Sequence, residues 1–316
     1  MATGRVFTDR ELLEAGQLTV DLIAGRLAQG DHAGAKDLLQ RFQSELMTMF
    51  FSYTGWEKSI LEYFAEFDGE ARRDKVLAAV ENWEIAPERK VEIPSTAQRW
   101  NEEISAILEL IDAHSTAAAT ERSLELRRVA LEFHDGMLSR VTALLSTLYE
   151  DHGEEVLMQV LNQVMKPESM DPDGKLPFRE KVENIMHFTR CHLLPFTVTE
   201  DTEKVTFMPD PCPSGARLIR AGHYQSPRNG AIVRDAGPLT YGRKEIPVYC
   251  CHEPAMEMIS ALRTGTPLFL VEPPEDIGTS PCKIFVYKDP AQIPETYYRR
   301  LGLEKPGDLI ARSGMG

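Results

Sequence analysis

The sequence predicts an α+β protein in which an all-helical N-terminal region precedes a smaller, mainly antiparallel sheet region with a few helices. Three observations predict this class. Apolar residues recur at helical spacing up to about residue 165, short β-branched and aromatic segments separated by turns follow residue 195, and a polar, turn-rich run at 166–174 divides the two patterns. We therefore expect a helical domain over residues 1–165 and an α+β domain over residues 175–316.

The N-terminal helices are marked by caps and by apolar stripes. Thr8 and Glu11 form a capping box that predicts the start of a first helix, and Gly30 with Asp31 ends the helical pattern that follows. Later stripes predict further helices, and they begin at Ala35, Ile60, Val76, Trp100, Leu124 and Val156. This half of the chain is apolar enough to form the interface of a homodimer, although nothing in its pattern requires one.

The C-terminal half contains short strands separated by turns. Helices are expected over about residues 177–189, 254–263 and 294–301. The segments with strand character are 196–198, 204–207, 216–219, 247–249, 268–271 and 283–287. Most of their connections are too short for parallel crossovers, so we expect antiparallel pairing.

The composition of the chain excludes several classes of function. The 316 residues include 35 Lys and Arg against 49 Asp and Glu, a formal net charge of −14, and a nucleic-acid-binding protein would need a basic face. No window of about 18 apolar residues predicts a transmembrane helix, and the first residues lack the apolar core of a signal peptide. We therefore expect a cytoplasmic protein whose partner is a small-molecule substrate.

The cysteines are confined to one part of the chain. All five lie between residues 191 and 282, and they are Cys191, Cys212, Cys250, Cys251 and Cys282. Reduced thiols point to metal binding, catalysis or plain burial. If a strand ends at residues 249–252, its alternation places Cys250 and His252 on one face, where a thiolate and an imidazole suit Zn²⁺ or Fe²⁺. Cys212 and Cys282 each lie beside proline, in turns that would fix the direction of a ligand.

The spacing of these residues matches no zinc finger, so a metal site would have to be assembled from distant segments. In the simpler interpretation Cys191, Cys251 and Cys282 are small buried hydrophobes, and His192 and His252 are satisfied polar groups. In a third interpretation Cys212 is a nucleophile, with His192 or His252 as its base. The amides around Ser214 would then form an anion-binding nest.

Other residues are candidates for binding substrate or moving protons. Arg217 could hold a carboxylate bidentately, and Ser214 and Tyr249 are further candidate substrate contacts. The acids nearest these motifs are Glu253, Glu257 and Glu272. In the helical half, His134 lies within an otherwise apolar helix, where a lone histidine is typical of a satisfied core or surface residue.

About 180 residues at the C-terminal end carry a family resemblance. The motifs are 192–198 (HLLPFTV), 210–217 (DPCPSGAR), 249–252 (YCCH), Glu272-Pro-Pro with Pro281-Cys282, and 287–290 (YKDP), with the helical segment 134–160. In these motifs the chain resembles the L-2-amino-thiazoline-4-carboxylate hydrolase-like bacterial proteins. It is also loosely similar to ligand-binding proteins of the four-vinyl-reductase type. The resemblance implies a compact α+β module that gathers Cys212, Cys250, His252 and Cys282, with His192 near them.

Three functions remain open from the sequence. The first is a metal-dependent hydrolase acting on a small heterocyclic or C–N/C–S bonded, carboxylated substrate. Zn²⁺ or Fe²⁺ on Cys212, Cys250, Cys282 and His252 would activate water there, and His192 or Glu272 would move protons while Arg217 holds the carboxylate. The second is a non-catalytic small-molecule-binding or sensor module with a structural zinc site. The third is a metal-free enzyme with Cys212 as nucleophile.

Overall fold

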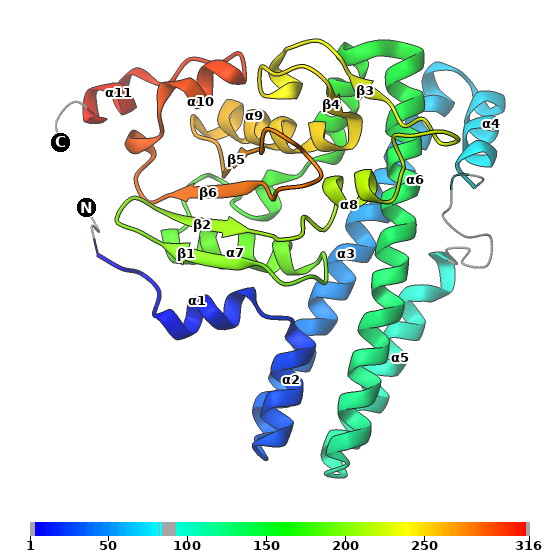
Figure 1. The fold of residues 1–316 in the computed structure, drawn as a ribbon, viewed down its shortest axis with the longest axis vertical. Helices are drawn as coiled ribbons and strands as arrows, with labels where there is room; N and C mark the ends of the chain where they lie inside the picture. The colour runs from blue at the N-terminus through cyan, green and yellow to red at the C-terminus, as the bar shows by residue number, and fades with distance from the viewer. Residues whose placement is uncertain (1–3, 82, 84–92, 314–316) are drawn as a thin grey trace.

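The computed structural model describes residues 4–81, 83 and 93–313, and it confirms the predicted α+β class (Figure 1). A helical region comes first in the chain and a region built on an antiparallel sheet follows it. The helices of the first region are α1 (Asp9–Gly16), α2 (Thr19–Ala28), α3 (His32–Phe67), α4 (Glu70–Glu81), α5 (Ile93–Asp112) and α6 (Thr116–Val164).

Local sequence signals define the ends of these helices. The capping box at α1 is present, since Glu11 N–H donates to Thr8 Oγ1 at 3.2 Å and Thr8 N–H donates to Glu11 Oε2 at 2.7 Å. Helix α6 is a 49-residue run that absorbs two of the predicted stripes. Gly153, with φ 81° and ψ −171°, interrupts it between them. A left-handed φ of this kind suits glycine because glycine has no Cβ.

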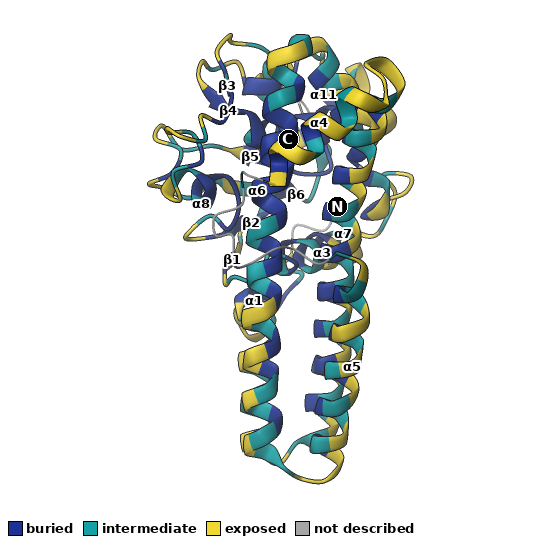
Figure 2. Ribbon diagram, turned by 90° about the vertical axis from the view of Figure 1, so that its right-hand side faces the viewer, coloured by how far each residue is buried: buried dark blue, intermediate teal, exposed yellow. Residues whose placement is uncertain are grey.

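The helical bundle buries a continuous apolar core. Helix α3 packs against α2, α5 and α6, and Ile23, Leu39, Leu46 and Ile107 are almost completely buried among them. Each such side chain contributes about 1.5–3 kcal/mol by leaving water. The lower ends of these helices extend beyond the sheet region, and their buried sides face one another (Figure 2).

One buried ion pair joins α3 to α6 within the bundle. Arg140 Nε donates to Glu57 Oε2 at 2.9 Å, and a second nitrogen of the guanidinium contacts the other carboxylate oxygen. Both residues are 6% exposed. Two charges buried this far from water are tolerated because each neutralises the other in a bidentate contact.

The C-terminal region is built on a four-stranded antiparallel sheet with strand order β1-β2-β6-β5, and a two-stranded sheet pairs β3 with β4. In β2, Val205 and Phe207 alternate with more exposed neighbours and face the core, opposite Val286 and Ile284 of β6. The strands are β1 (Thr197–Glu200), β2 (Lys204–Met208), β3 (Ile232–Val233), β4 (Ile246–Pro247), β5 (Leu270–Glu272) and β6 (Lys283–Tyr287).

Helices surround this sheet and connect it to the bundle. Helix α9 contacts both α6 and β5, and α1 contacts β1. The buried core continues from the bundle into the sheet without a break. The helical elements of this region are η1 (Pro167–Ser169), α7 (Phe178–Arg190), α8 (Gly215–Arg220), η2 (Pro238–Thr240), η3 (Val248–Cys251), α9 (His252–Thr264), η4 (Pro290–Gln292), α10 (Glu295–Arg300) and α11 (Gly307–Ser313).

Two of the predicted strands are wrong. Residues 216–219 belong to helix α8, because the Ala, Arg and Leu in this segment are strong helix formers and outweigh the single β-branched Ile219. Residues 248–251 form the 3₁₀ turn η3 and lead directly into α9, so β4 ends at Pro247. The strand alternation expected for Cys250 and His252 therefore does not exist.

Within the described ranges, no helix is both long enough and apolar enough to cross a membrane.

Candidate functional site

Two cavities adjoin each other between the bundle and the sheet region. The larger has a volume of about 560 Å³ and the smaller about 80 Å³. Five residues line both, and they are Phe188, His192, His252, Glu253 and Phe269. The two spaces therefore meet at a wall that contains two imidazoles and one carboxylate.

Helix α3 supplies much of the wall of the larger cavity. Its apolar contributions include Met47, Phe51 and Trp56, and the end of α6 and the following turn add Val164, Met165 and Met170. Phe51 is 65% exposed and marks the rim. Gly55 also lines this space, and a Cβ built on it meets no other atom within 4 Å. This cavity is a mainly apolar pocket that becomes polar where it meets the smaller one.

Three thiols line the smaller cavity. Cys212 comes from the loop before α8, Cys250 from η3 and Cys282 from the loop before β6. The α8 loop passes so close to Cys250 that a Cβ on Gly215 would lie 2.4 Å from Cys250 Sγ. Ser214 lines the same cavity, and its Oγ is 4.0 Å from Cys212 Sγ.

Burial keeps two of these thiols protonated. Burial raises the pKa of Cys250 well above its usual value, and the neighbouring Cys212 and Cys282 raise it further. The pKa of Cys282 is raised in the same way, first by burial and then by Cys212. A neutral thiol is a poor nucleophile, so Cys250 and Cys282 do not act as ready thiolates at neutral pH. In the part of the chain that the structure describes, no three His, Cys, Asp or Glu side chains are arranged to hold a metal ion.

His252 pairs with Glu253 at the junction of the cavities. Its Nδ1 lies 2.6 Å from the Tyr249 carbonyl oxygen and its Nε2 lies 3.3 Å from Glu253 Oε1. Burial alone would lower the pKa of His252, but the Glu253 carboxylate outweighs burial and raises it. The Trp56 ring packs against this imidazole with a centroid separation of 5.5 Å.

His192 is held by a second histidine behind the cavity wall. His192 Nδ1 lies 3.0 Å from His134 Nε2 and 3.5 Å from the Tyr53 hydroxyl. His134 Nδ1 lies 3.2 Å from Asp135 Oδ1, and Asp135 pairs with Arg217. Burial lowers the pKa of both histidines, and for His192 the shift is well below the usual value.

The structure brings most of the predicted site residues together. His192, Cys212, Ser214, Cys250, His252 and Cys282 all line the smaller cavity, and Tyr249 lines the larger one. Arg217 lines neither, because its guanidinium binds Asp135 of α6. Glu272 also lines neither, because it lies at the end of β5 and accepts a hydrogen bond from the Tyr297 hydroxyl at 2.9 Å.

Several residues of the site had no clear signal in the sequence. Tyr53 and Trp56 reach the cavities from α3, which is distant in sequence from the cysteines. His134 is completely buried, as expected for a core residue, and it lines neither cavity, but it contacts His192 from behind the cavity wall. The sequence signal that could have linked His134 to a functional site was the adjacent acid Asp135 on the same apolar helix. A buried histidine beside a carboxylate is a common way to orient an imidazole.

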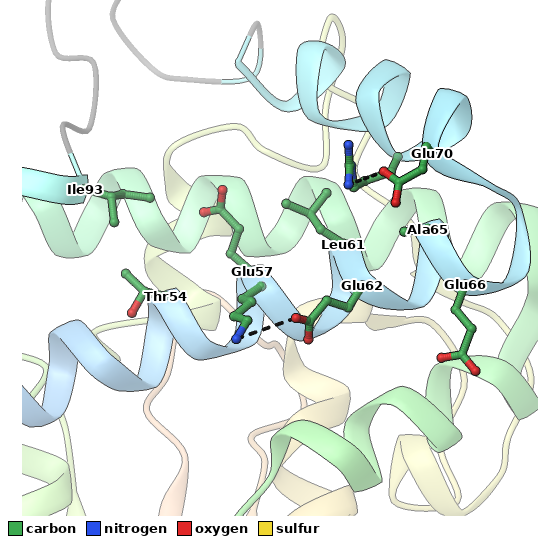
Figure 3. Close-up of a pocket in the computed structure, with 10 residues that line it drawn as sticks. Thr54, Glu57, Leu61, Glu62, Ala65, Glu66, Glu70 and Ile93 are labelled. Atoms are coloured by element: carbon green, nitrogen blue, oxygen red, sulfur yellow. Dashed lines mark ion pairs between the residues drawn. The ribbon is translucent and has the colours of Figure 1, made fainter.

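A separate hollow of about 630 Å³ lies between α3 and α4 (Figure 3). Its wall is acidic, with Glu62, Glu66 and Glu70 among its residues. The charges there pair locally, as Lys58 Nζ does with Glu62 Oε1 at 3.6 Å. The hollow shares no lining residue with the two cavities, so it is not part of the site.

No protein-family model, curated protein or solved structure matches this chain, so the site has to be interpreted from its own chemistry.

Proposed function

We propose that this protein binds a small, mainly apolar molecule in the larger cavity, with the polar end of that molecule at the wall shared with the thiol-lined cavity. The observation that carries the proposal is the apolar pocket of about 560 Å³ that ends at His192, His252 and Glu253. Pockets for small ligands are typically of this size, with apolar walls and a few convergent polar groups.

The polar wall would orient the molecule. His252 and Glu253 satisfy each other, whereas His192 Nε2 has no hydrogen-bond partner among the described residues. Apolar area would supply most of the affinity, and His192 would select the orientation.

A larger side chain in the wall of the cavity should weaken binding without unfolding the protein. We expect the fluorescent apolar probe N-phenyl-1-naphthylamine to bind with a stoichiometry of one. We expect Gly55→Leu to weaken this binding by about tenfold or more, since Gly55 lines the pocket and a larger side chain there has open space around it. Gly55→Ala is the matched control, because it makes the same change in the α3 backbone but adds one methyl group. Equal affinity in the two variants would contradict the proposal, and a probe titration by fluorescence distinguishes the outcomes.

A metal-dependent hydrolase is the second candidate, and the convergence of Cys212, Cys250 and Cys282 with His252 on one small cavity favours it. Thiols and imidazole are the donors that Zn²⁺ and Fe²⁺ prefer. The family resemblance supports a small heterocyclic or C–N/C–S bonded substrate. Arg217 and Glu272 have no part in this candidate as the structure places them.

Metal loading would require these side chains to move together, and the buried thiols would release their protons on binding. A bound ion would supply Lewis acidity and an activated water. His192, which lines the same cavity, would accept a proton there through Nε2. His252 would have to exchange its contact with Glu253 for the ion.

Elemental analysis of the purified protein tests the second candidate. If the protein is a metal-dependent hydrolase, it should hold about one equivalent of zinc or iron, retained in Cys251→Ala and lost in Cys250→Ala and Cys282→Ala. Cys251 is the control because it is adjacent to Cys250 but lines neither cavity, with its sulfur buried 3.9 Å from the Pro247 carbonyl oxygen. Absence of metal after reconstitution would rule this candidate out and leave the binding function.

A further inference from the structure

A continuous line of polar contacts runs from α8 through α6 to the cavity wall. Arg217 binds Asp135 Oδ2, and Asp135 Oδ1 lies 3.2 Å from His134 Nδ1. His134 Nε2 then lies 3.0 Å from His192 Nδ1. The line ends at the Nε2 of His192, which lines both cavities.

The charges at one end of this line determine the position of every proton along it. Burial would raise the pKa of Asp135, but the contacts with His134 and Arg217 outweigh burial and lower it, so Asp135 is a carboxylate. A carboxylate only accepts hydrogen bonds, and therefore His134 Nδ1 carries a proton and donates it to Asp135. His134 is neutral, so its Nε2 has a lone pair.

The position of the proton on His192 follows from that lone pair. The lone pair on His134 Nε2 requires a donor at 3.0 Å, since two lone pairs at that distance would repel, so His192 carries its proton on Nδ1. Tyr53 is consistent with this arrangement. Its oxygen lies 3.5 Å from His192 Nδ1, from which it can accept, and 3.3 Å from both His134 Nε2 and the Tyr249 oxygen. Its one proton can go to either of these two acceptors, and in both cases His192 Nδ1 keeps its own proton.

We infer that Asp135 and His134 are positioning residues that hold His192 in the tautomer with a bare Nε2, so the cavity selects an apolar molecule that presents a hydroxyl or N–H group to His192. The inference rests on the proposed binding function. It narrows the ligand class, because a bound molecule with only an acceptor at that end would cover the Nε2 lone pair and leave it without a partner.

One substitution should exchange donor and acceptor at every hydrogen bond between residue 135 and His192. In Asp135→Asn the amide has a single oxygen, and Arg217, which can only donate, requires that oxygen. The amide N–H then faces His134 Nδ1 and forces His134 to accept there and to donate from Nε2. His192 Nδ1 becomes an acceptor and its proton moves to Nε2, so the cavity presents a donor in place of an acceptor.

The tautomer can be measured directly from imidazole ¹⁵N chemical shifts in the full-length protein. We expect His192 to be protonated on Nδ1 in the parent and on Nε2 in Asp135→Asn. Asp151→Asn is the matched control, because Asp151 also lies on α6 and pairs with an arginine, Arg72, but lines neither cavity. Protonation of His192 on Nε2 in the parent would overturn the inference, whichever molecules bind.

Two probes of similar shape test the ligand class. We expect 2-naphthol, which has a hydroxyl donor, to bind the parent and Asp151→Asn about tenfold more tightly than 2-methoxynaphthalene, which has none. Asp135→Asn should lose or reverse this ratio. Equal affinities in the parent would overturn the ligand class, and this result needs no variant to fold. Failure of both probes and of N-phenyl-1-naphthylamine, with the Nδ1 tautomer present, would instead contradict the binding function itself.

Discussion

Replacing Arg140 with methionine should lower the free energy of unfolding by about 3–5 kcal/mol. The substitution keeps most of the side-chain volume. It leaves the Glu57 carboxylate, which is 6% exposed at the edge of the hollow between α3 and α4, without its bidentate partner. An uncompensated buried charge is among the most destabilising features of a folded protein, because it has lost its hydration and gained nothing in return. Urea denaturation followed by circular dichroism measures the loss.

Two further variants test whether the buried, unpaired Glu57 carboxylate causes the loss of stability in Arg140→Met. The double variant Glu57→Leu with Arg140→Met should recover much of the loss, since it removes both charges together. Arg128→Met, also on α6, breaks exposed pairs with Glu125 and Glu132 and should cost about 1 kcal/mol or less. A loss in Arg128→Met as large as in Arg140→Met would show that burial of the pair is not what matters.

Gly16→Ala should cost about 3 kcal/mol or more, a large effect for one added methyl group. A Cβ at this position would lie 1.9 Å from the Phe196 carbonyl oxygen, at the point where Phe196 N–H donates to the Gly16 carbonyl at 3.0 Å. The obstacle is backbone, so no change of rotamer relieves it, and α1 would have to move away from β1. Thermal unfolding of the variant measures the effect.

Gly25→Ala is the matched control for that measurement. Gly25 lies in the neighbouring helix α2, and a Cβ built on it meets no atom within 4 Å. The substitution removes the conformational cost of glycine in a helix and should stabilise the protein by up to about 1 kcal/mol. Similar stability in the two variants would contradict the close approach of α1 to β1.

The fold could be predicted where periodicity and turn signals agree. The stripes in α3 and α6 face the core, and β6 has the predicted bounds, because side-chain patterning determines which face is buried. The strands predicted over 216–219 and 247–249 were wrong, since α8 covers the first segment and β4 ends at Pro247 in the second. In the first, helix propensity outweighed one β-branched residue, and in the second a proline-bounded strand turned immediately into a helix.

The sequence grouped residues that line one cavity, but it did not indicate the partners of their side chains. The segregation of the cysteines and the family resemblance pointed to Cys212, Cys250, Cys282 and His252, and all of them line one cavity. The sequence predicts that Arg217 holds a substrate carboxylate, and this role depends on which residue the guanidinium contacts in the folded protein. That neighbour is Asp135, which is 82 positions away, and no local pattern encodes such a contact.

The close passage of Gly215 over Cys250 has a consequence for how the sequence can change in evolution. The space that any larger residue at 215 would need is already occupied by the Cys250 sulfur. The two positions are therefore expected to covary. Homologous chains with glycine at position 215 can keep a cysteine at position 250. Chains with a larger residue at position 215 should have a smaller residue at position 250, and they would lose one of the three sulfurs from the cavity wall.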